Sequence, residues 1–89
     1  MEIKRSATAG TLESSDVYIE IEPGQGVIEI DLESVVKQQF GEAIHATVMD
    51  VLDEQQVTSA KVHVIDRGAL DCVLRARMET AIVRGREEI

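Results

Sequence analysis

The sequence predicts an α+β domain of two layers, in which a mixed sheet of about four strands carries two helices on one face. Apolar residues alternate with polar ones in three segments of the chain, which is the period of a half-buried strand. In two later segments they recur at steps of three and four, which is the period of an amphipathic helix. With a short strand at the start, the predicted order is β-β-β-α-β-α.

The first strand is predicted from weak signals. Ser6, Thr8, Ala9 and Thr11 suit a short edge strand, although their side chains are small and their alternation is poor. The polar stretch Glu13-Ser14-Ser15-Asp16 follows it and predicts an exposed turn, because Ser and Asp side chains bond to nearby backbone in turns.

The next two strands show clean alternation. Between residues 17 and 22 the apolar side chains are Val17, Ile19 and Ile21, and the same period resumes with Ile28, Ile30 and Leu32. The intervening Pro23-Gly24-Gln25-Gly26 interrupts the pattern and favours a turn. We therefore expect these two strands to form an antiparallel hairpin.

The first helix is predicted to start near Ser34, whose hydroxyl suits an N-cap. Its apolar stripe consists of Val36, Phe40, Ile44, Val48, Val51 and Leu52.

Residues 57–65 alternate again and predict a strand. A right-handed crossover through the first helix should place it parallel to the strand that precedes that helix.

The second helix is predicted to follow a turn at Asp66-Arg67-Gly68, and Gly85 is expected to cap its end. The apolar face of that helix is predicted to hold Leu70, Val73, Leu74, Met78, Ala81 and Ile82.

Composition narrows the function. The chain has 89 residues, expected to form a single domain, 1–89, and its net charge is −8. Clustered cations and aromatic rings bind nucleic acids, and cations bind anionic lipids, so neither nucleic acid nor a membrane is an expected partner. The chain shows no apolar run that could cross a bilayer and no secretory signal, which favours a cytoplasmic protein.

Few residues offer chemistry of their own. Cys72, the one cysteine, is expected to pack in the core. His45 and His63 have no partner at metal-ligand spacing, so we predict no metal site, and no catalytic motif is present. The adjacent Ser14 and Ser15 remain as exposed hydroxyls, and the residues alone leave open whether they form a plain turn or a covalent attachment point.

Three stretches of the chain resemble one family. They are Ala9 to Ile19, with the turn Gly10-Thr11-Leu12-Glu13-Ser14; residues 37–44, with Gln39-Phe40-Gly41; and residues 66–77, with Gly68-Ala69-Leu70-Asp71-Cys72. They occur in the same order in the acyl carrier (gamma) subunit of bacterial citrate lyase, which this chain resembles over nearly its whole length.

The resemblance implies that Ser14 is the covalent attachment point of 2'-(5''-phosphoribosyl)-3'-dephospho-coenzyme A, joined through a phosphodiester. Ser15, where many members of the family have Gly, is the less favoured site. The chain would then be a non-catalytic carrier that presents acetyl and citryl thioesters to the alpha and beta subunits of citrate lyase. A transferase that loads the prosthetic group would be a further partner.

Three alternatives are kept. The related carrier subunit of malonate decarboxylase uses the same group on a similar scaffold. An ordinary phosphopantetheine carrier is an all-helical bundle with its serine at a helix start, which the predicted strands disfavour. The third alternative is an unmodified protein-interaction domain.

Overall fold

The computed structural model describes residues 2–87, except for the side chain of Lys37. Within that part of the chain there are four strands and two helices, in the predicted order. The elements are β1 (Ala7–Gly10), β2 (Val17–Pro23), β3 (Ile28–Ser34), α1 (Lys37–Glu54), β4 (Ala60–Asp66) and α2 (Asp71–Arg86).

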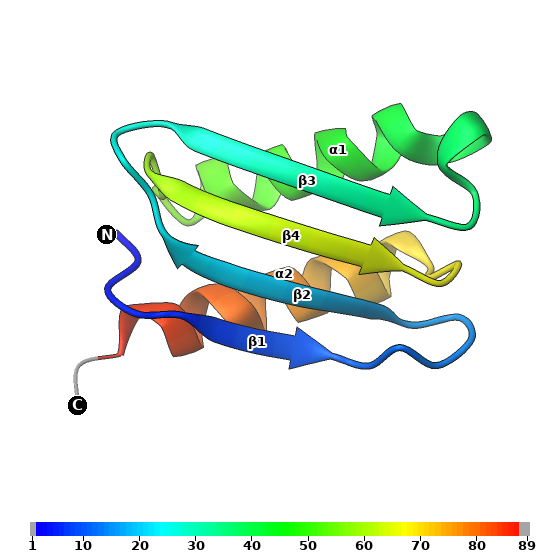
Figure 1. Ribbon diagram of the computed structural model, residues 1–89, viewed down its shortest axis with the longest axis horizontal. Helices are drawn as coiled ribbons and strands as arrows, with labels where there is room; N and C mark the ends of the chain where they lie inside the picture. Colours follow the sequence, from blue (N-terminus) through cyan, green and yellow to red (C-terminus); the bar gives the residue numbers. More distant parts are fainter. Residues whose placement is uncertain (1, 88–89) are drawn as a thin grey trace.

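The strands form one mixed sheet with the order β1-β2-β4-β3. β1 pairs with β2 and β2 with β4 in antiparallel fashion, whereas β3 and β4 are parallel neighbours, as the crossover through α1 predicts. Both helices lie behind the sheet in Figure 1 and leave its other face open. The two-layer α+β fold class is therefore confirmed.

The predicted hairpin of the second and third strands is wrong, because β4 lies between them. Residues 24–27 cross the start of β4, where the amide of Ala60 donates to the carbonyl of Val27 at 3.1 Å. Burial agrees with this order: Val62 and Val64 of the central strand β4 are fully buried, whereas the inward side chains of the edge strand β3 are only partly buried. Alternation predicts a strand but does not specify its neighbour.

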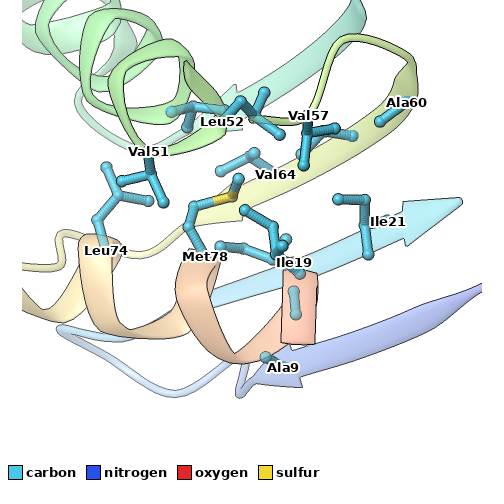
Figure 2. Packing of buried hydrophobic residues seen from close by; sticks show 14 of the residues in the cluster. Ala9, Ile19, Ile21, Val51, Leu52, Val57, Ala60, Val64, Leu74 and Met78 are labelled. Carbon is cyan, nitrogen blue, oxygen red and sulfur yellow. The ribbon is translucent and has the colours of Figure 1, made fainter. Parts of the chain in front are cut away.

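The core lies between the sheet and the helices. Met78 of α2 is completely buried and lies near Ile19 of β2 and Val64 of β4, with Val51 and Leu52 of α1 on the other side (Figure 2). This close packing fixes α2 against the strands that flank the serine turn.

The ends of the helices differ from the sequence predictions. Ser34 is the last residue of β3 rather than the N-cap of α1, and its hydroxyl accepts a bond from the amide of Val36 and donates to the carboxylate of Asp66. Phe40 and Leu70, expected in the core, are 52% and 70% exposed; Phe40 lies in the first turn of α1, and Leu70 directly precedes α2.

Gly85 is not a C-cap, because α2 continues to Arg86. Its carbonyl accepts the backbone amides of Lys4 and Arg5 at 2.8 and 3.1 Å. A Cβ at this position would lie 3.1 Å from Cγ2 of Ile3. The glycine therefore allows the N-terminal segment to pack closely on α2.

Candidate functional site

The serine turn joins β1 to β2 at one end of the sheet, beside the connection from β4 to α2 (Figure 1). The amide of Asp16 donates to the carbonyl of Glu13 at 3.1 Å, which closes a four-residue turn with Ser14 and Ser15 at its centre. Ser15 has a φ of 65°, the left-handed conformation that a turn with this bond often requires at its third position. The predicted exposed turn is thus a hairpin tip.

Both serine side chains are exposed, and within the described part of the chain neither hydroxyl makes a hydrogen bond. An enzyme that uses serine as its own nucleophile places a base within hydrogen-bond reach of it. Neither described histidine is hydrogen-bonded to a serine of the turn. His45 lies on α1, and His63 of β4 contacts Asp31 and Glu33 on the open face of the sheet. Within the described residues, the turn therefore presents two accessible hydroxyls to which no side-chain base is hydrogen-bonded.

Two backbone bonds brace the turn from one side. The amide of Ser15 donates to the carbonyl of Arg67 at 2.8 Å, and the amide of Arg67 donates to the carbonyl of Asp16 at 2.9 Å. These bonds extend the pairing of β2 with β4 by one step beyond the strands. The turn is therefore held along the start of the β4–α2 connection.

Asp16 braces the turn from the other side. Its carboxylate accepts two bonds from Arg77 of α2, at 3.1 and 2.9 Å, and one each from the hydroxyl of Thr11 and the amide of Val17, at 2.6 and 2.7 Å. The Arg77 guanidinium, then Thr11 and the Val17 amide, hold the pKa of this carboxyl well below its usual range. The carboxylate stays charged and fixes the base of the turn to α2.

Sequence reasoning missed the roles of Asp16 and Arg77. The two are 61 residues apart in the chain, so no local spacing relates them. The only local signal was the position of Asp16 directly after the serines, which suggests a turn-forming carboxylate but not its partner.

Asp66 organises the neighbouring connection. Its side chain is 2% exposed and accepts the amides of Gly68 and Ala69 at 3.1 and 3.0 Å, together with the hydroxyl of Ser34 at 2.8 Å. A buried carboxylate that receives several such bonds is well stabilised. These bonds fix the backbone of residues 66–69, which includes Arg67.

The other candidate residues do not join this site. Cys72 is exposed rather than packed in the core, because the first turn of α2 precedes its buried stretch, which begins at Leu74. Among the residues described, no group of three or more His, Cys, Asp or Glu could hold a metal ion. No helix in the same part of the chain has the length and apolar character to span a bilayer.

An apolar groove of about 300 Å³ lies at this end of the molecule, between the first turns of the two helices. The exposed side chains of Phe40 and Leu70 form part of its wall. Gly68 and Ala69 also line it, so the groove adjoins the connection that braces the serine turn.

Comparison with known proteins identifies the class. The family model described as "ACP: Malonate decarboxylase delta subunit (MdcD)" matches residues 4–85, nearly the whole chain. Among solved structures, a chain of a Pseudomonas malonate decarboxylase hetero-tetramer has the same fold, with a TM-score of 0.76 and 23% identity over 91% of this chain and 84% of that chain. The fold and the family model thus define an acyl carrier subunit.

Curated relatives narrow the class. The citrate lyase acyl carrier protein of Oenococcus oeni is 51% identical over 84 residues, covering 94% of this chain and 87% of the relative. That of Serratia proteamaculans is 57% identical over 86 residues, covering 94% and 83%. The chain therefore belongs to the citrate lyase acyl carrier protein family, whose members are carrier subunits and not catalysts.

Proposed function

We propose that Ser14 is the covalent attachment point of a phosphoribosyl dephospho-coenzyme A group, joined through a phosphodiester to the serine Oγ. The observation that carries this proposal is an exposed hydroxyl that makes no hydrogen bond within the described residues, at a turn braced by Arg67 and Asp16, in a chain of an acyl carrier family. The resemblance of the turn to the family's segment favours Ser14 over Ser15.

The residues present fit such a group. Ester formation needs one accessible oxygen, and the exposed side chain of Ser14 supplies it at the tip of the β1–β2 hairpin. When bound, the group supplies a thiol that carries an acyl thioester. The chain itself contributes a rigid anchor, because Asp16 and Arg77 hold the base of the turn against α2.

In this proposal the protein presents acetyl and citryl thioesters to the alpha and beta subunits of citrate lyase during cleavage of citrate to acetate and oxaloacetate. A tethered thioester has a high effective concentration at each partner site, which free diffusion would not provide. The complex and the transferase that loads Ser14 are expected in the cytoplasm.

Charge supports the choice of partners. With a net charge of −8, the carrier should be steered toward basic surfaces on the alpha and beta subunits and on the transferase. The association rate should fall as sodium chloride is raised, measured by stopped-flow mixing with purified subunits. A rate that does not change with ionic strength would exclude electrostatic steering.

The attachment is tested by intact mass and peptide mapping of the protein purified from its native host. The proposal predicts an added mass equal to the group, on the peptide that contains Ser14. Fragmentation that assigns the mass to Ser15 would move the site. An unmodified protein in an active complex would overturn the proposal and favour an unmodified interaction domain.

A malonate decarboxylase carrier is the second candidate, favoured by the description of the matching family model and by the likeness of fold. The names of the curated relatives favour citrate lyase. Reconstitution distinguishes the two: the loaded carrier should restore citrate cleavage with citrate lyase alpha and beta subunits. Restoration of malonate decarboxylation alone would select the second candidate.

A further inference from the structure

Arg67 differs from the other arginines of the chain. Each of the other arginine side chains donates to an acid, a carbonyl or an amide oxygen: Arg5, Arg75, Arg77, Arg84 and Arg86. Within the described residues, the exposed guanidinium of Arg67 has no such partner. Lys61, near the opposite end of β4, is the other described cation without one.

The backbone places Arg67 next to the attachment serine. Its carbonyl oxygen lies 2.8 Å from the amide nitrogen of Ser15, which is bonded directly to the carbonyl carbon of Ser14. With a peptide C–N bond of about 1.33 Å, the backbones of Arg67 and Ser14 approach to roughly 4 Å. The bond from the Arg67 amide to the carbonyl of Asp16 fixes this register, so the long Arg67 side chain begins within reach of Ser14.

Neighbouring acids do not neutralise Arg67. The carboxylate of Asp16 already accepts bonds from Nε and Nη2 of Arg77. The carboxylate of Asp66 already accepts bonds from two backbone amides and from the hydroxyl of Ser34. Glu13, beside Ser14, makes no ion pair within the described part of the chain. In a protein with a net charge of −8, a free cation therefore adjoins the one turn that is proposed to receive an anionic group.

We propose that the guanidinium of Arg67 binds the phosphate of the diester on Ser14, an inference that rests on the proposed function. The planar fork of arginine matches two phosphate oxygens, and such charge-assisted bonds are stronger than neutral ones. The contact offsets the repulsion between the anionic group and the acidic carrier. It holds the phosphate at the anchor, while the remainder of the arm stays free to move.

The test is phosphorus NMR of the protein loaded by its transferase, as wild type, Arg67→Ala, Arg67→Lys and Lys61→Ala. In Arg67→Ala, the diester resonance should shift to the position of a serine phosphodiester in an unstructured peptide. Arg67→Lys should shift it partway, because lysine keeps the charge but not the fork. Lys61→Ala, which removes an unpaired cation far from the turn, should leave it unchanged.

A second measurement needs no variant. In proton–nitrogen spectra of the wild-type protein, the Nε–H resonance of Arg67 should shift between the unmodified and the loaded form. If loaded wild type and Arg67→Ala have the same phosphorus resonance and the Nε–H signal does not move, the inference is wrong while the proposed function stands. A native protein without added mass at Ser14 would overturn both.

Discussion

Ser15 adopts a backbone conformation that few residues other than glycine adopt easily. Its φ of 65° lies in the left-handed region, and a non-glycine residue there costs about 1–2 kcal/mol. The turn keeps this conformation because the Ser15 amide is bonded to Arg67 and the Asp16 amide to Glu13. Strain is thus stored beside the serine proposed to carry the prosthetic group.

Replacing Ser15 with glycine should therefore stabilise the protein. The relief of strain exceeds the added entropy of the unfolded chain, so we expect the Ser15→Gly variant to gain about 0.5–1 kcal/mol in free energy of unfolding. Urea denaturation followed by circular dichroism measures the change. Ser15→Ala, which keeps the strain, should not gain free energy of unfolding. Equal stability of the two variants would contradict the claim that residue 15 is strained.

Asp16 should make folding stability depend on pH. Its pKa in the folded protein is lowered by Arg77, Thr11 and the Val17 amide, whereas in the unfolded chain it should lie near the usual value of about 4. The stability that Asp16 contributes is therefore fully present above about pH 5. It is lost progressively as the pH falls toward the lowered pKa of Asp16, because protonation breaks the bonds to Arg77.

The Asp16→Asn variant should lose most of this dependence. Its free energy of unfolding should be lower than that of wild type at neutral pH, and the difference should shrink as pH falls toward 2. Asp71 keeps part of the slope, since Thr47 and then Arg75 lower its pKa as well. Parallel curves for the two proteins, from urea titrations at each pH, would show that Asp16 is not the titrating group.

At the scale of elements, the hairpin of β1 and β2 is shaped by close backbone approach. Gly10 ends β1 with a φ of 90°, and a Cβ there would lie 1.8 Å from the carbonyl oxygen of Val17. Gly26, in the connection from β2 to β3, has a φ of 88°, but a Cβ there would meet nothing within 4 Å. The two glycines therefore share a conformation and differ in their surroundings.

This pair gives a matched test. Gly10→Ala should lose at least about 2 kcal/mol of stability, because the clash adds to the conformational strain. Gly26→Ala should lose only about 1 kcal/mol, the cost of the conformation alone. Urea denaturation of both variants measures the difference, and losses of equal size would show that β1 and β2 do not approach so closely at Gly10.

Helix α2 connects the core to the serine turn through two adjacent residues, Arg77 and Met78, whose side chains contact different parts of the protein. Met78 is completely buried against the sheet, and Arg77 reaches Asp16. Met78→Ala should cost about 2–5 kcal/mol, as large-to-small core replacements do. A loss below about 1 kcal/mol in thermal and urea denaturation would contradict the central position of this side chain.

For the whole molecule, periodicity predicted both helices and every strand except β1, because each of these elements buries one face on the same core. It did not predict that β4 separates β2 from β3, because alternation shows that a strand has one buried face but does not specify its neighbours in the sheet. Helical periodicity placed Phe40 and Leu70 in the core and residue type placed Cys72 there, although all three are exposed near the starts of the two helices.

The candidate site was also predicted only in part. Ser14 was predicted from the turn and from the family resemblance, both of which are local in sequence. The contacts that hold it come from Arg67 and Arg77, which only the folded chain brings to the turn. The result is a carrier whose serine turn, the proposed attachment loop, is hydrogen-bonded at its base and exposed at its tip.

The central claim is that Ser14 anchors the prosthetic group. The most direct test is the intact mass of wild type, Ser14→Ala and Ser15→Ala after coexpression with the loading enzymes. The full added mass is expected on wild type and Ser15→Ala and none on Ser14→Ala, with circular dichroism showing all three folded. Full loading of Ser14→Ala, or loss of loading in Ser15→Ala alone, would contradict it.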